Sequence, residues 1–265
     1  MDPSPNLQFS TAPFFRHPVR EAFRNIASAG YNRVEVMVTA DPATQEPHLL
    51  RDLAEEHELR IDTIHAPMLL VTRRVWGSDP ITKIYRSVQL AQAVGANVVV
   101  AHPPYRWQVR YRRWLDTSVE ELSERSGVTI AVENMFPVKV RGERGLTFHA
   151  SQDFEDLERY PSLVLDTSHA AVSRIDILDA VDRYQDNMVH VHVSNNAGKG
   201  WDSHLPVYDG ILPIGPFLER LASNGFGGSV SIELDLRPWF KDEDGLQATM
   251  VKNKEFCEAA LGVRA

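Results

Sequence analysis

Apolar and polar residues alternate along the chain with two different periods. Short apolar, β-branched runs predict eight strands, at residues 7–10, 34–38, 60–65, 98–102, 129–133, 163–166, 189–194 and 229–234. Between them, apolar residues recur at helical spacing, as in 19–27 and 84–94. Gly30, Gly95 and Gly127 stand just before the next strand, where a helix C-cap belongs. The alternation predicts parallel strands joined by helices.

The number of these units decides the architecture. Eight strand and helix units within 265 residues are typical of a closed (β/α)8 TIM barrel, an α/β fold. We expect one domain over residues 1–265, because no Ser/Gly/Pro-rich linker divides the chain and its 43% hydrophobic content can supply a sizeable core. In such barrels, functional sites form at the C-terminal ends of the strands.

Composition narrows the classes of function. The formal net charge of −8 argues against a general nucleic-acid coat, although a local basic strip remains compatible with it. Cys257 is the single cysteine, so an internal disulfide is excluded and thiol chemistry is not expected. The chain starts without a basic segment followed by an apolar core, and no apolar run reaches the ~18 residues of a membrane span. We therefore expect a cytoplasmic protein with no membrane partner.

The ends of the predicted strands carry the candidate chemistry. Six consecutive strands close with a residue that can bind a metal ion: His65, His102, Glu133, Asp166, His192 and Glu233. One such residue is commonly a satisfied core side chain. Six ionisable groups at one face of a barrel would be very costly to bury without a cation. The pattern therefore predicts a divalent-metal centre at the barrel mouth.

The seventh strand and the loop after it add further candidates. His190 and His192 alternate with valines, so both point to one side of the strand. We expect His192, nearer the C-terminal end, to bind the ion and His190 to orient a neighbouring ligand. Asp202 and His204 offer a hard oxygen and an imidazole, which suits zinc or manganese. Glu35, at the end of the second strand, either orients a histidine, contacts substrate or makes a stabilising buried hydrogen bond.

Two of the acidic strand ends suggest a reaction. Glu133 and Glu233 close the fifth and eighth strands, so their carboxylates can approach a small ligand from different sides while sharing an ion. With a metal-polarised carbonyl, one glutamate can remove the proton on the adjacent carbon, and the other can return it to the opposite face. This arrangement predicts a sugar or sugar-phosphate isomerase or epimerase that works through an enediolate at the ion. A purely structural pair of ligands is the alternative.

These residues carry a resemblance to the xylose isomerase-like barrel superfamily, which includes sugar isomerases and epimerases and endonuclease IV-type enzymes that act on abasic DNA. The motifs are Glu133-Asn, Asp166-Thr-Ser-His169, Asp202-Ser-His204 and Ile-Glu233, with His192 in its strand. The epimerase branch implies one ion at Glu133, Asp166, His192 and Glu233. The endonuclease branch implies three zinc ions, with His65, His102, His169, Asp202 and His204 as additional ligands.

Local departures from both branches leave the reaction open. The chain has His102-Pro-Pro, Glu133-Asn-Met and Tyr208-Asp-Gly where endonucleases tend to have His-Pro-Gly, Glu-Asn-Thr and Gly-Glu-Gly. It has Asp202-Ser-His where ketose 3-epimerases usually carry an arginine. A metal-dependent isomerase or epimerase is the leading interpretation. The alternatives are a zinc-dependent phosphodiesterase of abasic DNA and a metal-stabilised sugar-binding barrel without activity.

Substrate contacts are expected from residues around the same mouth. The candidates are His65, His169, Arg106, Trp201 and Arg237. The segment 105–114 mixes aromatic residues with arginines, so it either grips a phosphate or base or forms an amphipathic helix with solvated arginines. His149 is expected at the surface or in a lid. A small sugar is the expected partner, DNA belongs to the alternative, and the oligomeric state stays open, with a homo-oligomer compatible.

Overall fold

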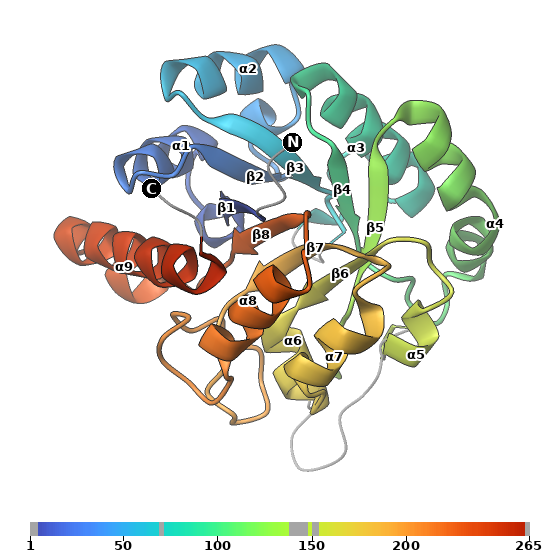
Figure 1. Cartoon of the computed structure of the whole chain (residues 1–265). Helices are drawn as coiled ribbons and strands as arrows, with labels where there is room; N and C mark the ends of the chain where they lie inside the picture. The colour runs from blue at the N-terminus through green and yellow to red at the C-terminus, as the bar shows by residue number, and fades with distance from the viewer. Residues whose placement is uncertain (1–4, 69–71, 138–147, 150–153, 263–265) are drawn as a thin grey trace.

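The computed structural model describes residues 5–68, 72–137, 148–149 and 154–262, and it confirms the predicted barrel. Eight parallel strands, in the order in which they occur in the chain, close on one another (Figure 1). They are β1 (Asn6–Ser10), β2 (Arg33–Met37), β3 (Arg60–His65), β4 (Val98–Ala101), β5 (Thr129–Glu133), β6 (Leu163–Asp166), β7 (Met188–Val193) and β8 (Ser229–Ile232). Because β4 and β8 end earlier than predicted, His102 and Glu233 lie directly beyond their strands.

Helices surround the barrel and follow most of the strands (Figure 1). They are α1 (Val19–Ser28), α2 (Pro47–Glu56), α3 (Pro80–Val94), α4 (Val109–Ser126), α5 (Phe154–Leu157), α6 (Thr167–Ser173), α7 (Ile177–Tyr184), α8 (Ile214–Ser223) and α9 (Glu243–Leu261), with short 3-10 turns η1 (Ala12–Phe14), η2 (Pro42–Thr44) and η4 (Arg237–Trp239). Gly95 and Gly127 cap α3 and α4 in the left-handed conformation, as their positions in the sequence predicted. Within the described ranges, no helix combines the length and apolar character needed to cross a bilayer.

The apolar core lies mainly between the strands and the helices. Phe23 and Ile26 of α1, for example, are fully buried in it. The barrel interior differs, because Gln8 Nε2 of β1 donates to Thr63 Oγ1 of β3 at 2.9 Å, and these strands are not neighbours. A small apolar set of Val100, Ala131 and Val164 forms a separate cluster. Packing of the outer layer therefore supplies most of the hydrophobic stabilisation, and polar residues approach the mouth from inside.

Candidate metal centre

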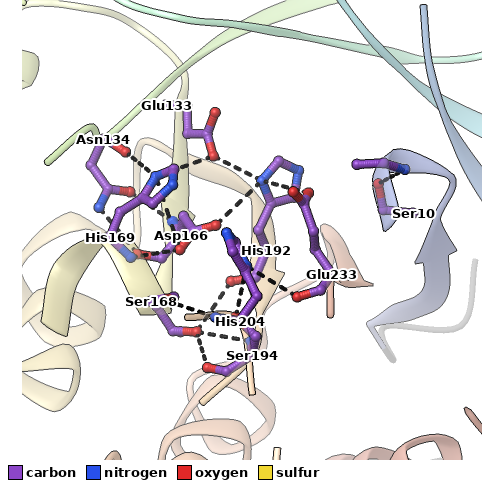
Figure 2. A network of polar contacts seen from close by, with 12 residues as sticks. Ser10, Glu133, Asn134, Asp166, Ser168, His169, His192, Ser194, His204 and Glu233 are labelled. Atoms are coloured by element: carbon purple, nitrogen blue, oxygen red, sulfur yellow. Dashed lines mark hydrogen bonds and ion pairs between the residues drawn. The ribbon is translucent and has the colours of Figure 1, made fainter. Parts of the chain in front are cut away.

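Three carboxylates predicted at strand ends converge on the imidazole ring of His192, which lies near the end of a fourth strand (Figure 2). Nδ1 of His192 lies 2.9 Å from Glu133 Oε1, 3.7 Å from Glu233 Oε2 and 3.8 Å from Asp166 Oδ2. We call Glu133, Asp166, His192 and Glu233 the mouth cluster. Three of these side chains are at most 2% exposed, whereas Glu233 retains 19% exposure. The structure therefore brings the predicted ligand set together, with Glu233 on the more open side.

Local structure holds Asp166 in this position. It is the last residue of β6 and the N-cap of α6, where its Oδ1 accepts from the backbone N–H of His169 at 2.8 Å. Asn134 directly follows β5 and bridges to the same residue. Its Oδ1 accepts from the N–H of Asp166 at 2.6 Å, and its Nδ2 donates to the Asp166 carbonyl at 3.1 Å. Asn134 thereby fixes the end of β6 relative to the end of β5, which carries Glu133.

Replacing Asn134 by alanine should destabilise the fold by about 2 kcal/mol, because the buried N–H and carbonyl of Asp166 lose their side-chain partner. The same change should weaken divalent-ion binding, since Asp166 is no longer held against Glu133. Urea unfolding and isothermal titration with Mn²⁺ or Zn²⁺ measure the two effects. Asn253→Ala is the matched control, because Asn253 is also buried and bonds the backbone of Val207 and Thr249, at 2.8 and 2.7 Å, outside the mouth cluster. Equal ion affinity in the two variants would contradict a positioning role for Asn134.

Buried carboxylate oxygens without hydrogen-bond partners make the mouth cluster a suitable site for a cation. Asp166 Oδ2 and Glu233 Oε2 are buried and have no hydrogen-bond partner within the described structure, and burial raises the pKa of both carboxyl groups. Burial also raises the pKa of Glu133, but the neighbouring His192 and His102 lower it well below its usual range. Three carboxylates around one imidazole make a donor set of hard oxygens and one nitrogen, which suits a divalent ion. The residues present therefore fit the ion that the sequence predicts.

The remaining predicted ligands join the same network. His102 Nε2 lies 3.1 Å and His65 Nε2 lies 3.7 Å from Glu133 Oε2. Asp202 Oδ2 lies 2.7 Å from His204 Nε2 and 3.4 Å from His169 Nε2. Burial lowers the pKa of His169, but nearby carboxylates, that of Asp166 foremost, raise it to about 10. Every residue predicted as a ligand thus lies in one connected cluster, while its role as a ligand stays a prediction.

The candidate ligand atoms that lie closest together form groups other than the mouth cluster. In the described part of the chain, three groups have candidate ligand atoms that all lie within 4.8 Å of one another: Glu35 with His190 and His192, His65 with Glu133 and His192, and Asp166 with His169 and His204. The second and third combine residues expected for different ions. The geometry is therefore compatible with one ion or with more.

Glu35 connects the two histidines of β7 from inside the barrel. Its Oε2 lies 2.8 Å from His190 Nε2, and its Oε1 lies 3.1 Å from His192 Nε2. Burial raises the pKa of Glu35, but His192 and His190 lower it well below its usual range, so the carboxylate accepts from both rings. Nε2 of His192 is thus bound to Glu35, and Nδ1 of the same ring faces the three carboxylates of the mouth cluster. Of the alternatives open at the sequence level, the contacts favour an orienting role for Glu35.

Glu35→Gln should lower divalent-ion affinity about 10- to 100-fold, because the amide cannot accept from both histidines and His192 loses its fixed orientation. Equilibrium dialysis followed by elemental analysis measures this loss. Asp62→Asn provides a control, since Asp62 is a buried carboxylate of β3 that pairs with Arg33 and Arg60 and not with the mouth cluster. If Glu35→Gln retained the affinity of the parent protein, the proposed orienting role would be wrong.

The structure corrects the expectation for His149, which is buried and not a surface or lid residue. It is 8% exposed, and its Nδ1 lies 2.8 Å from the carbonyl oxygen of Pro103. Its ring stacks on Tyr105 at 4.6 Å and lies 6.4 Å from the ring of His102. An antiparallel bridge between Tyr105 and His149 joins the loops after β4 and β5. The sequence showed no sign of this pairing, because both partners lie in irregular loops.

A cavity of about 660 Å³ borders the mouth cluster at Glu233, and we call it the mouth cavity. Its polar lining includes Glu233, His102, His149 and His204, together with Asp235 and Arg237. Of the residues predicted to contact substrate, Arg237 lines this cavity. Arg106 and Trp201 are exposed and are not part of its described lining. His65 and His169 lie deeper, against Glu133.

The sequence left two interpretations open for the segment 105–114, a ligand-binding segment or an amphipathic helix, and each applies to one half of it. Its second half begins α4, where Tyr111 is buried and Arg112 and Arg113 are exposed, as in an amphipathic helix. Its first half supplies Tyr105 and Trp107 to the mouth cavity. The aromatic residues, and not the arginines, therefore lie at the site.

Comparison with known proteins identifies the family to which the chain belongs. Residues 23–251 match the family model described as xylose isomerase-like TIM barrel, so the chain belongs to that family. An uncharacterized protein of Mycobacterium leprae is 34% identical over 256 residues, which covers 88% of this chain and 90% of that protein.

Solved structures share the barrel at lower sequence identity. A D-tagatose 3-epimerase-like protein superposes with a TM-score of 0.69 at 23% identity and covers 97% of both chains. An AP endonuclease, family 2, from Brucella melitensis has a TM-score of 0.68 at 20% identity, over 91% of this chain and 96% of that one. These identities show the fold, and the predicted resemblance to this superfamily is confirmed. Epimerases and endonucleases both occur among these structural neighbours, so the shared fold leaves the reaction to be argued from the site.

Proposed function

We propose that the protein is a divalent-metal-dependent isomerase or epimerase of a small sugar or sugar phosphate. The observation that carries this proposal is the convergence of three carboxylates on His192 Nδ1, with buried, unpartnered oxygens on Asp166 and Glu233. Glu133, Asp166, His192 and Glu233 would hold the ion. When bound, it would polarise a substrate carbonyl and the neighbouring hydroxyl.

The chain's own acids and bases would then move the proton. Glu233 borders the mouth cavity and can reach a sugar that lies in it. Glu133 lies at the end of β5, and its Oε1 is 2.9 Å from the His192 Nδ1 that also lies 3.7 Å from Glu233 Oε2. One carboxylate removes the proton from the carbon next to the carbonyl. Return of a proton to the opposite face of that carbon by the other carboxylate inverts it, whereas delivery of the proton to the former carbonyl carbon, with transfer of the hydroxyl proton from one oxygen to the other, shifts the carbonyl. The structural neighbour named as D-tagatose 3-epimerase-like supports this direction.

A zinc-dependent phosphodiesterase that acts on abasic DNA is the second candidate. The observation in its favour is that His65, His102, His169, Asp202 and His204 join the network around Glu133, as a site with several ions requires. The AP endonuclease neighbour is compatible with it. Metal content separates the two: about three zinc equivalents in the purified protein would favour the phosphodiesterase, and one equivalent of manganese, cobalt or magnesium the isomerase.

Hydrogen exchange tests the proposed reaction directly. The metal-loaded protein is incubated in deuterated water with a panel of ketoses, aldoses and their phosphates, and in parallel with an abasic-site DNA duplex. We expect deuterium to enter the carbon next to the carbonyl of at least one sugar, even where net conversion is small. Metal-dependent nicking of the duplex without exchange on any sugar would instead establish the second candidate.

A further inference from the structure

The mouth cavity has a polar floor and a strongly apolar wall. The wall includes Phe15, Met37, Trp107, Met135, Phe136 and Phe148. None of these side chains offers a hydrogen-bond acceptor of useful strength, and the indole N–H of Trp107 is the one strong donor among them. A sugar hydroxyl pressed against this wall would lose its water partners without replacement, which costs free energy. The part of a ligand that lies here is therefore poor in hydroxyl groups.

Exposed aromatic side chains gather at this cavity. Among the described residues, Phe15 at 38%, Trp107 at 66% and Phe148 at 37% are three of the seven large hydrophobic side chains that remain exposed, and all three line the mouth cavity. Exposed apolar groups that cluster around a concave site mark a ligand-binding surface. Their position beside Glu233 and His204 makes this surface continuous with the metal centre.

The aromatic rings of this wall are held by contacts with one another and by a bond between their loops. Tyr105 stacks on Trp107 with ring centroids 4.9 Å apart and 7° between the ring planes. Tyr105 also stacks on His149, with ring centroids 4.6 Å apart. The backbone N–H of Arg106 donates to the Phe148 carbonyl at 2.9 Å, which ties the two loops that carry these rings. Trp107 also meets Phe148 at 6.5 Å in an edge-to-face arrangement. A flat apolar group can therefore stack here with little loss of side-chain freedom.

Charge around the cavity does not favour an anionic group. Arg237 is the one arginine or lysine in the described lining. Its guanidinium is already paired with Asp235, with Nε 2.7 Å and Nη2 2.6 Å from the two carboxylate oxygens. Asp235 and Glu233 add negative charge to the same lining. The charge of this arginine is therefore already balanced by Asp235, which weakens its attraction for a phosphate.

We propose that the mouth cavity is a subsite for an uncharged aromatic substituent, so that the substrate is a keto sugar derivative such as an aryl glycoside with a ring ketone. This inference rests on the proposed function for the sugar end of the ligand. A glycosidic bond blocks the sugar's own anomeric carbonyl, so the ketone must be a ring carbon already present in the substrate. The volume of about 660 Å³ lies in the range that encloses a drug-sized ligand, and such a ligand is larger than a bare monosaccharide.

Paired ligands test the subsite by binding alone. The metal-loaded protein is titrated calorimetrically with phenyl β-glucoside, methyl β-glucoside and glucose 6-phosphate. We expect the phenyl compound to bind at least about tenfold more tightly than the methyl compound, because only it stacks on the aromatic wall. Undetectable binding of phenyl β-glucoside, equal affinity for both glucosides, or tightest binding of glucose 6-phosphate would overturn the proposal.

Variants assign this preference to the wall. Trp107→Ala and, separately, Phe148→Ala should reduce the phenyl preference severalfold, whereas Trp107→Phe should retain most of it. Tyr85→Ala is the control, since Tyr85 is an exposed aromatic residue at 39% that does not line the mouth cavity. An unchanged phenyl preference in both alanine variants would contradict the subsite. Phenyl glucoside binding without deuterium exchange, either on the sugar panel or on a phenyl glucoside that carries a ring ketone, would leave the subsite standing and refute the proposed reaction, so the two failures are distinguishable.

Discussion

Replacing Asp166 by alanine is expected to lower divalent-ion affinity by more than about a hundredfold, beyond what loss of an outer partner of a metal ligand costs. The carboxylate has one buried oxygen without a hydrogen-bond partner, 3.8 Å from His192 Nδ1, and it also belongs to the compact group of ligand atoms with His169 and His204. Its removal takes one negative charge and one oxygen donor from the mouth cluster. Isothermal titration with Mn²⁺, Co²⁺ and Zn²⁺ and elemental analysis of the purified variant measure the loss.

Asp166→Asn separates this effect from a loss of folding. Asp166 also caps α6 through its Oδ1, and the asparagine oxygen can keep that bond to the N–H of His169. The alanine variant loses the cap as well, which should cost about 1 kcal/mol of stability. Asparagine should therefore retain stability and still bind the ion poorly. Undiminished metal content in both variants would exclude Asp166 as a ligand.

The second large effect is expected at the two glutamates. Glu133→Gln and Glu233→Gln should each slow deuterium exchange on the substrate by about 10²- to 10⁴-fold, the range in which a positioned acid or base contributes to proton transfer. Glutamine preserves the size of each side chain and removes its ability to hold or deliver a proton. Mass spectrometry of sugar incubated in deuterated water, at saturating metal, gives the exchange rates.

Metal loading has to be established before these rates are interpreted, because both glutamates are also proposed ligands. Each variant is assayed at ion concentrations above its own dissociation constant, and its metal content is measured in the same sample. The double variant Glu133→Gln with Glu233→Gln should lose little more than either single variant, since groups that act as a unit are not additive. Full exchange activity in either metal-loaded single variant would rule out the proton-transfer pair.

Most of the fold was predictable because its determinants are local. The eight runs of β-branched residues and the helical spacing between them have different periods, and each run corresponds to an observed strand. The parallel closed barrel then follows from the alternation. Placement of the candidate site was also predictable, because all strands of a parallel barrel end on the same side. A residue such as Asp166 could therefore be assigned to the mouth from its position at the end of a strand.

The sequence by itself determined the barrel and the chemical types gathered at its mouth. Only the tertiary structure decided which atoms meet. Three contacts show this: Glu35 with His190 and His192, the Asn134 side chain with the Asp166 backbone, and the bridge between Tyr105 and His149. Each joins different strands or loops, and no local period encodes such pairs. The aromatic wall is of the same kind, because Phe15 and Phe148 meet in one cavity from distant parts of the chain. Local sequence patterns record the period of each element, whereas packing across the barrel mouth depends on where all the loops come together.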